Sequence, residues 1–382
     1  MSVENIRKEV MQTLGKNINI FVDKFLVNTD KIWQPSDFLP NPQGANFIEE
    51  VKEIQELGKE LDDDFWISLV GDTITEEALP TYESWLMSLD GVKQDPDNGW
   101  GKWIRAWTAE ENRHGDVLNK YLYLSGRVNM REVEISTQHL IADGFDIGTA
   151  TDPYKNFVYT SFQELATYIS HNNVAKIARK KGHKALAKMS KIIAGDEMRH
   201  HLAYSHFIEE IFKIDPSEMM LAYFYMMKNQ IIMPAMHLRE SFGEKSSLFD
   251  QFSIVAQRAG VYTGFDYVDI MRKLNVLWKI DKITGLNAEA EKARDYLMRL
   301  PDRMYRLAER SVIPDTAYQF NSNCSLSKVA VSNNFSTIKV SFSTSFLDIS
   351  AYFLLFSGSL SLLNRSIPSN ATLIVAKGVL NS

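Results

Sequence analysis

Apolar residues recur at three- and four-residue steps through most of the chain between residues 45 and 310. In the segment 47–61 the residues that follow this spacing are Phe47, Ile48, Val51, Ile54, Leu57 and Leu61. Such spacing places the apolar side chains on one face of a helix. The same pattern predicts helices over 65–89, 101–125, 154–180, 184–212 and 217–230, several of them twenty residues or longer. Because strand-like alternation is scarce here, the sequence predicts an all-α bundle.

Four dipeptides that end in proline mark the predicted boundaries of the helices. They are Asp95–Pro96, followed by two glycines, Asp152–Pro153, Asp215–Pro216 and Leu300–Pro301. Proline lacks the backbone N–H that a helix interior needs, and it disfavours helical geometry in the residue before it. We therefore predict a helix boundary at each pair.

Residues 311–382 differ in composition from the rest of the chain. Only six of these 72 residues are charged and sixteen are serines, whereas 24% of the whole chain is charged. We predict a working domain over 1–320 and a poorly ordered Ser/Asn-rich tail over 321–382. The uncharged run between Asp348 and Arg365 is shorter and more polar than the ~20 apolar residues of a membrane helix, so we expect no stable membrane insertion.

Composition limits the possible partners and metal ligands. The formal net charge of -6 provides no basic field for nucleic acid, so we exclude a nucleic-acid partner. Cys324 is the only cysteine, so a metal must be held by histidines and carboxylates. The first residues match neither a secretory signal nor a transit peptide, which predicts a cytoplasmic protein, although a processed plastid protein would look the same.

Two Glu-x-x-His pairs provide candidate metal ligands, Glu111 with His114 and Glu197 with His200. Residues three apart share a face of a helix, so each pair can offer a carboxylate oxygen and an imidazole nitrogen to one ion. A short motif of this kind also arises by chance. The pairs alone therefore only suggest a metal site.

A lone glutamate precedes each pair by a similar interval. Glu76 lies 35 residues before Glu111, and Glu164 lies 33 residues before Glu197. This interval spans one helix, a turn and the return, so each lone glutamate comes level with its pair in an antiparallel bundle. Four glutamates and two histidines on such helices match the known arrangement of ferritin-like di-iron and di-manganese proteins. Oxygen and nitrogen donors of this kind suit iron or manganese.

Five stretches carry a family resemblance that covers about residues 25–310. They are LVGDTITEEALPTYE, WTAEENRHGDVLNKYLYLSGRV, FVYTSFQELATYISHNN, AGDEMRHHLAYSHF and AQRAGVYTGFDY. In order and content they resemble the soluble acyl-[acyl-carrier-protein] desaturases. The resemblance implies a ferritin-like helical bundle with additional packed helices and two iron ions per subunit. Its implied iron ligands are Glu76, Glu111, His114, Glu164, Glu197 and His200.

The resemblance also implies a reaction and partners. The expected reaction is the O2-dependent introduction of a cis double bond, at the delta-9 position, into a saturated 16- or 18-carbon chain. The chain would be carried on acyl carrier protein, electrons would come from ferredoxin, and the enzyme would be a homodimer. Basic residues are needed to dock the acidic carrier. The candidates are Arg199, Arg272, Lys273, Lys279 and Lys282.

Further site residues follow from the same resemblance. Thr167 is expected beside the oxygen-binding side of the cluster, and electrons are expected to pass from Trp33 through Asp196 to His114. The deep end of the acyl channel is expected at Trp85, Ser88, Leu89, Ile147 and Phe157. Relatives that prefer eighteen carbons carry Met and Pro where this chain has Trp85 and Ile147, which favours a sixteen-carbon substrate.

Several of these residues have a purely structural alternative. Trp33 and Trp107 could be packed aromatic residues, and Thr167 could bond back to its own helix. We interpret His171, His183 and His206 as surface or hydrogen-bonded core histidines, because none follows a glutamate at three residues. His201 stands where many relatives carry Glu. The alternative functions are an iron-storage ferritin-like protein without an organic substrate and an inactive desaturase with an altered C-terminus.

Overall fold

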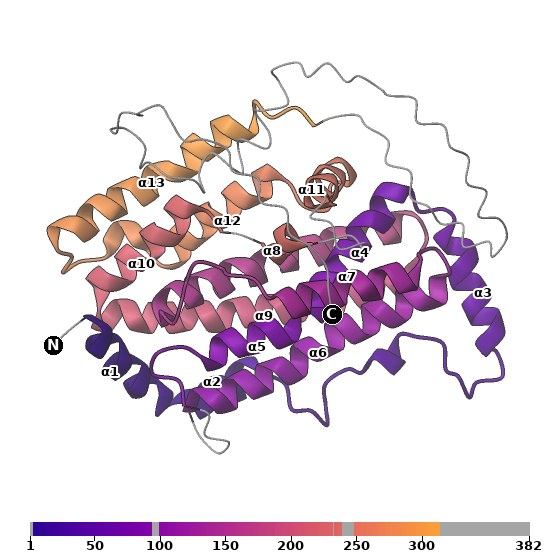
Figure 1. Cartoon of the computed structure of the whole chain (residues 1–382), viewed down its shortest axis with the longest axis horizontal. Coiled ribbons are helices and arrows are strands. Elements are labelled where there is room, and N and C mark those ends of the chain that lie inside the picture. Colours follow the sequence, from indigo (N-terminus) through magenta and orange to yellow (C-terminus); the bar gives the residue numbers. More distant parts are fainter. Residues whose placement is uncertain (1–2, 94–98, 232, 239–247, 314–382) are drawn as a thin grey trace, which may run out of the picture. The chain divides into compact units, whose positions relative to one another are not determined.

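The computed structural model describes residues 3–93, 99–231, 233–238 and 248–313, and in these residues the chain is helical, without strands (Figure 1). The α-helices are α1 (Val3–Gly15), α2 (Ile18–Phe25), α3 (Phe47–Gly58), α4 (Asp63–Glu77), α5 (Leu79–Met87), α6 (Gly99–Ser125), α7 (Met130–Asp143), α8 (Pro153–Lys180), α9 (Lys184–Ile214), α10 (Pro216–Asn229), α11 (Leu248–Ala259), α12 (Gly264–Leu277) and α13 (Ala288–Ala308). Short 3-10 helices occur at η1 (Pro35–Asp37), η2 (Pro234–His237) and η3 (Ile280–Lys282). The predicted all-α, ferritin-like fold class is confirmed.

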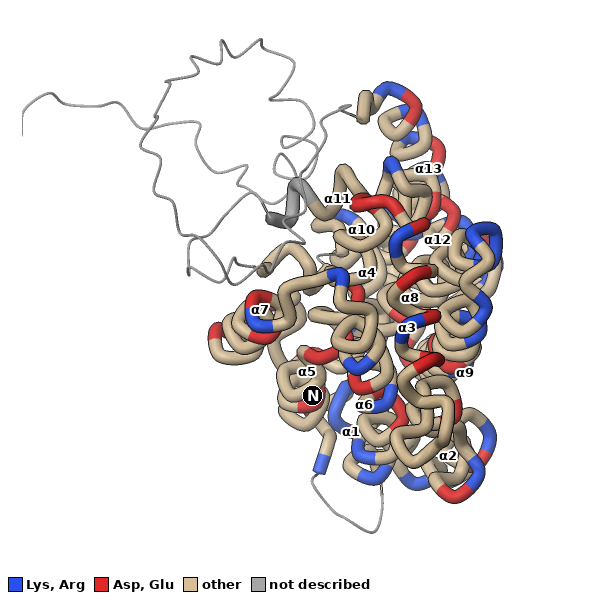
Figure 2. Tube along the Cα trace, turned by 90° about the vertical axis from the view of Figure 1, so that its right-hand side faces the viewer, with Lys and Arg blue, Asp and Glu red and all other residues tan. Residues whose placement is uncertain are grey.

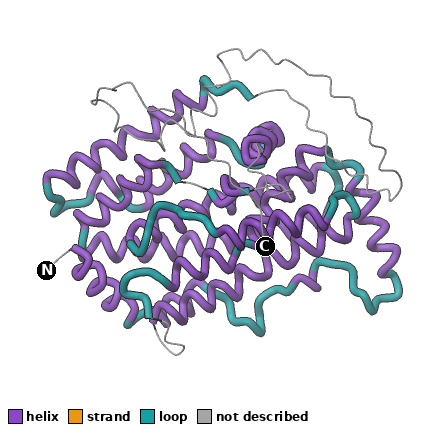
Figure 3. The backbone as a smooth tube through the Cα atoms, in the orientation of Figure 1, coloured by secondary structure: helices purple, strands orange, loops and turns teal. Residues whose placement is uncertain are grey.

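Helices α4, α6, α8 and α9 form the centre of the fold, as the labels of Figure 1 and the same view in Figure 3 show. α8 and α9 pack along most of their length as an antiparallel pair. The turn between them depends on Gly182, whose φ of 82° is in the left-handed region that glycine adopts without steric cost. The N–H of His183 closes the turn on the carbonyl of Ala178 at 2.8 Å, as in a Schellman motif.

Outer helices cover this centre on two sides. α10, α12 and α13 pack on one another, and α10 and α12 also contact α8. α1 and α2 contact α6 and α9. Large aromatic residues fill the interior, among them the fully buried Trp66, Trp103 and Tyr204. Charged residues of both signs are distributed over the helices (Figure 2).

Two of the predicted proline boundaries are helix starts. α8 begins at Pro153, and the carboxylate of Asp152 caps it by accepting the N–H groups of Tyr154 and Lys155. α10 begins at Pro216. Proline fits the first turn of a helix because that turn has no partner for its N–H.

The predicted boundary at Leu300–Pro301 is wrong, because α13 continues through Pro301. Proline removes the N–H that would bond to the carbonyl four residues earlier, which is Leu297. The side-chain amide of Asn275 donates to that carbonyl at 3.0 Å. Tyr223 holds Asn275 by donating to its side-chain oxygen at 2.9 Å. A residue on another helix therefore replaces the missing hydrogen bond.

The predicted single helix over 65–89 is also wrong, because it is divided at Ala78 into α4 and α5. Pro80 lies in the first turn of α5 and cannot donate a backbone hydrogen bond. Three further helices, α1, α2 and α7, were not predicted as separate helices from the apolar spacing.

The predicted boundary at residue 320 and the tail over 321–382 lie outside the described residues, so both stay predictions. Within the residues that the structure does describe, no helix is both long and apolar enough to cross a membrane.

Candidate metal centre

The six predicted ligands come together on the four central helices. α4 contributes Glu76 and α8 contributes Glu164, while α6 and α9 contribute the two Glu-x-x-His pairs. All six side chains are buried, and both histidines are fully buried. Gly115 allows α6 to approach α4 at this point, since a Cβ there would lie 3.0 Å from Glu77 Cγ and 3.2 Å from the carbonyl carbon of Glu76.

The ligand atoms form two overlapping groups. One group contains Glu76, Glu111, His114 and Glu197, and the other contains Glu111, Glu164, Glu197 and His200. Within each group, one ligand atom per residue lies within 4.8 Å of the others. Glu111 and Glu197 belong to both groups. The geometry is thus that of two adjacent ion sites that share two carboxylates.

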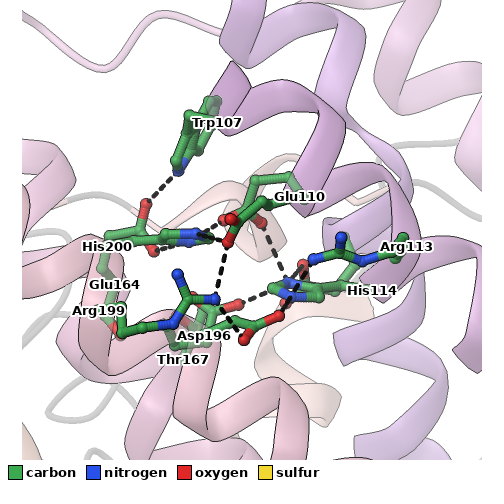
Figure 4. A network of polar contacts seen from close by, with 12 residues as sticks. Trp107, Glu110, Arg113, His114, Glu164, Thr167, Asp196, Arg199 and His200 are labelled. Atoms are coloured by element: carbon green, nitrogen blue, oxygen red, sulfur yellow. Dashed lines mark hydrogen bonds and ion pairs between the residues drawn. The ribbon is translucent and has the colours of Figure 1, made fainter. Parts of the chain in front are cut away.

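Each ligand histidine presents Nδ1 to the carboxylates and Nε2 to a second residue. His114 Nδ1 lies 3.2 Å from Glu111 and 2.9 Å from Glu197, and His200 Nδ1 lies 2.5 Å from Glu111. His114 Nε2 is 3.3 Å from Asp196, and His200 Nε2 is 3.0 Å from Glu110 (Figure 4). Because these carboxylates accept a hydrogen bond from Nε2–H, the lone pair of each Nδ1 points into the cluster.

Five of the converging atoms face only one another within the described residues, for example His200 Nδ1 and Glu111 Oε1 at 2.5 Å, and make no hydrogen bond to a group outside the cluster. They are Glu111 Oε1, His114 Nδ1, Glu164 Oε2, Glu197 Oε1 and His200 Nδ1. Buried ligand atoms whose only contacts are with one another have unused capacity to bind a further partner, such as a metal ion. Two divalent cations would carry four positive charges against the four glutamates. The residues therefore fit a two-metal centre.

Burial and mutual proximity shift the pKa values within the cluster. Burial disfavours a charged carboxylate, yet His114 and His200 outweigh it and lower the pKa of Glu111 to about 2. Burial, together with the charges of Glu111 and Glu197, raises the pKa of Glu164 well above its usual value. Although burial opposes it, neighbouring carboxylates raise the pKa of His200 well above its usual value. The cluster as a whole therefore favours added positive charge, because Glu111 stays negative while Glu164 and His200 hold their protons more tightly than usual.

Trp33, Asp196 and His114 are in direct contact. The indole N–H of Trp33 donates to Asp196 Oδ2 at 2.8 Å, and this same oxygen faces His114 Nε2. The rings of Trp33 and His114 are parallel, with centroids 6.0 Å apart. Trp33 is half-buried. A chain of contacts therefore links a partly exposed indole to a ligand.

Thr167 and Trp107 contact the ligand carboxylates. The hydroxyl of Thr167 lies 2.6 Å from Glu197 Oε2 and 3.0 Å from the carbonyl of Glu164, so it meets both the cluster and its own helix. Trp107 is buried, as expected of a core residue, and it also donates from its indole nitrogen to Glu164 at 3.2 Å.

The structure adds residues that the sequence analysis missed. Glu110 accepts from His200, and His171 Nε2 lies 2.9 Å from Glu76 Oε1. His171 is thus a hydrogen-bonded core histidine, but its partner is a candidate ligand. His183 is buried against Tyr121, and the half-buried His206 lies near Glu209. His201 is buried with Nδ1 2.8 Å from the carbonyl of Ser161 and does not join the ligand set.

A repeat in the sequence could have revealed Glu110. The segments Glu110–His114 and Asp196–His200 both read acidic-Glu-x-Arg-His. In each case the leading acid accepts from the histidine of the other segment. The repeat therefore encodes the outer hydrogen bonds as well as the ligands.

The predicted channel residues are not all buried. Leu89, Ile147 and Phe157 are buried in one hydrophobic core cluster, and Trp85 packs against it. Ser88 is exposed at the end of α5, and its hydroxyl donates to the carbonyl of Trp85.

A helical bundle in which four helices surround four carboxylates and two imidazoles defines the ferritin-like class of metal-binding proteins. The family model described as fatty acid desaturase matches residues 6–328. The chain belongs to this family and is an enzyme.

Curated relatives match most of the chain. A protein named stearoyl-[acyl-carrier-protein] 9-desaturase, chloroplastic, from Ricinus communis is 54% identical over 285 residues, which cover 74% of this chain and 72% of that protein. Its namesake from Spinacia oleracea is 53% identical over 285 residues, covering 74% and 71%. Among solved structures, DesA2 from Mycobacterium tuberculosis H37Rv is 18% identical with a TM-score of 0.46, covering 75% of this chain and 98% of that one, too weak a likeness to support an argument.

Proposed function

We propose that this chain introduces a cis double bond, at the delta-9 position, into a saturated 16- or 18-carbon acyl chain carried on acyl carrier protein. The observation that carries the proposal is the convergence on one space of five buried ligand atoms that, within the described residues, face only one another. The names of the relatives supply the substrate class. The reaction consumes the acyl chain, O2, two electrons and two protons, and yields the double bond and two waters.

Two iron ions are the proposed cofactor. They would supply the oxidation with O2 that a strong, unpolarised C–H bond requires and that no side-chain acid or base can perform. The four glutamates and two histidines would hold them, with Glu111 and Glu197 shared between the two sites. Asp196 and Glu110 would orient the histidines through their Nε2 atoms.

Residues around the cluster would keep it dry and control its protons. The aromatic side chains of Trp107 and Tyr204 are buried next to it, which excludes bulk water. The hydroxyl of Thr167 donates to Glu197 Oε2 at 2.6 Å, and we propose that it delivers a proton on the oxygen-binding side.

Electrons would enter through Trp33, Asp196 and His114. Above Asp196 lies an open groove of about 580 Å³ on the surface of α9. Its exposed cations are Arg179, Lys184, Lys188 and Lys191, none of which has a carboxylate partner in the part of the chain that the structure describes. A basic groove over the path to His114 suits an acidic electron carrier, and we propose that ferredoxin docks there.

Charge reversal tests this docking site. The double change Lys188→Glu with Lys191→Glu is expected to raise the KM for reduced ferredoxin about tenfold and to weaken its salt dependence. Reduction by dithionite should stay unchanged, since it needs no protein docking. Lys213→Glu, which alters another exposed lysine of α9 outside the groove, is the matched control. An unchanged KM in the double variant would place ferredoxin elsewhere.

The acyl carrier would dock on a different surface. Arg199, one of the predicted docking residues, donates hydrogen bonds to Glu110, Asp196 and the carbonyl of Phe25. Its guanidinium is therefore occupied within the protein and is not a docking candidate. Arg272 is paired with Asp269 and Asp302. The exposed residues Lys273, Lys279 and Lys282, on α12 and near η3, stay our candidates.

Location and assembly remain proposals. We propose the plastid stroma because both relatives described above are chloroplastic. We also propose a homodimer, as the family resemblance implies, and size-exclusion chromatography with light scattering measures it directly.

The activity has a direct test. The iron-loaded protein would be incubated with 16- and 18-carbon acyl carrier substrates, reduced ferredoxin and O2, and the acyl products analysed by mass spectrometry. A product lighter by two hydrogens, with its double bond at carbon nine, is the expected result. Iron uptake without any unsaturated product would instead favour storage.

A further inference from the structure

Arg199 lies between the two carboxylates that orient the ligand histidines (Figure 4). One guanidinium nitrogen, Nη2, donates to Asp196 Oδ1 at 2.6 Å and to Glu110 Oε2 at 2.8 Å. The other, Nη1, donates at 2.6 Å to the backbone carbonyl of Phe25, the last residue of α2. The guanidinium is therefore fixed from three sides.

Each of the two carboxylates connects Arg199 to a different histidine. Asp196 uses Oδ1 for Arg199 and Oδ2 for His114. Glu110 uses one oxygen, Oε2, for both Arg199 and His200. The two histidines belong to opposite ligand groups. A single side chain thus reaches both halves of the centre.

Arg113 occupies the equivalent place in the segment Glu110–His114, but in the part of the chain that the structure describes it contacts only one of the two carboxylates. Arg113 donates to Asp196 at 3.2 Å and lies over the ring of Trp33, but within the described residues it makes no hydrogen bond to Glu110. The two segments therefore have similar sequences but unequal contacts.

Electrostatics explains why this position needs a cation. Asp196 and Glu110 each place an oxygen within hydrogen-bond distance of the same nitrogen, so the two negative carboxylates lie close together in a largely buried setting. Without a positive charge between them they repel, and a carboxylate that turns away no longer receives the Nε2–H of its histidine.

We infer that Arg199 is a positioning residue that holds both ligand histidines at once, by fixing Asp196 and Glu110 in the orientations that receive His114 and His200. This inference rests on the proposed metal centre and adds to it a side chain that is shared by the two ion sites. Arg199 touches neither substrate nor ligand oxygen.

Cobalt binding to the metal-free protein tests the inference without any turnover. Co²⁺ bound by imidazole and carboxylates has visible absorption bands, so a titration reports the number of sites and their affinities. In Arg199→Gln we expect both sites to bind Co²⁺ at least about tenfold more weakly, the usual effect of losing an outer hydrogen-bond partner. Arg199→Lys should lose less, because an ammonium can still lie between the two carboxylates.

Arg7 provides a matched control. It is also a partly buried arginine between two carboxylates, at 2.5 Å from Asp152 and 3.0 Å from Glu218, but it lies outside the ligand network. Arg7→Gln should leave both Co²⁺ affinities unchanged.

The outcomes separate this inference from the proposed metal centre. If the unaltered protein binds no Co²⁺, the metal centre itself is wrong. If it binds two ions and Arg199→Gln binds them equally well, or loses affinity at one site only, the shared role of Arg199 is overturned. Should Arg199→Gln fail to fold by circular dichroism, Arg199→Met decides, because it also removes the positive charge, and equal affinities at both sites in that folded variant would refute the inference.

Discussion

Trp33 donates its indole N–H to Asp196 Oδ2 at 2.8 Å, and the same oxygen faces a ligand histidine. If electrons enter along this contact, Trp33→Phe should slow reduction by ferredoxin at least about tenfold. Loss of an outer hydrogen-bond partner of a metal site commonly has an effect of this size. Stopped-flow absorbance measures the rate. Trp66→Phe is the control, because Trp66 is a buried tryptophan that donates to the carbonyl of Gly58 instead. Equal rates for Trp33→Phe and the unaltered protein would remove Trp33 from the path.

Glu111 and His200 are predicted to be indispensable ligands. Glu111→Ala or His200→Ala should lose iron and activity while the helical content persists, because the helices bury their own apolar faces. Iron analysis and circular dichroism provide the two measurements. His206→Ala, on the same helix as His200 but half-exposed, should retain about two irons per chain, the number expected for a site of this type. Retention of both irons by Glu111→Ala would invalidate the ligand assignment.

Trp85 is predicted to limit the length of the acyl chain. Its ring packs edge-on against Phe145 with centroids 4.5 Å apart, so a smaller side chain should enlarge the space at this point. We expect the unaltered enzyme to prefer sixteen carbons and Trp85→Met to shift the preference towards eighteen. Each methylene is worth about 1–3 kcal/mol, so a change of tenfold or more in the ratio of kcat/KM is expected. A clear preference of the unaltered enzyme for eighteen carbons would defeat the idea.

His183 is predicted to make the fold sensitive to acid. Burial lowers its pKa from 6.5 to about 4, and Tyr121 lies 2.7 Å from its Nε2. Because the folded pKa is the lower one, the stabilisation is complete above pH 6.5 and is lost as the pH falls through about 4. The loss should reach up to about 3 kcal/mol. Urea unfolding of His183→Gln at several pH values should show a smaller decline between pH 6.5 and 4, and parallel curves would contradict this.

The chain beyond Phe320 is predicted to be dispensable. Its low charge and high serine content differ from the helical region, and the family match ends at residue 328. A protein truncated after Phe320 should remain folded, iron-loaded and active, with less aggregation than the full chain. Loss of folding or activity would show that the tail belongs to the working fold. If the truncated protein kept its activity but lost an association with membranes that the full chain has, the segment after Phe320 would be a membrane anchor.

Sequence spacing alone determined much of this protein. Helical periodicity predicted the long helices, because a 3.6-residue repeat leaves a direct trace in the order of apolar residues. The Glu-x-x-His pairs and the intervals before them identified six side chains that the structure brings together. A ligand set of this kind is readable because its members recur at fixed steps on regular helices.

Only the tertiary structure decided which residues support those ligands. The repeated segment points to Glu110, but the contacts of His171 and Arg199 join different helices without any such repeat, and they depend on how the helices pack. The same holds for the helix that contains Pro301. Asn275 of another helix donates to the carbonyl of Leu297, which the backbone of Pro301 cannot do. Local sequence specifies the hydrogen bonds within a helix, but a side chain that satisfies a group on a distant segment is set by three-dimensional packing.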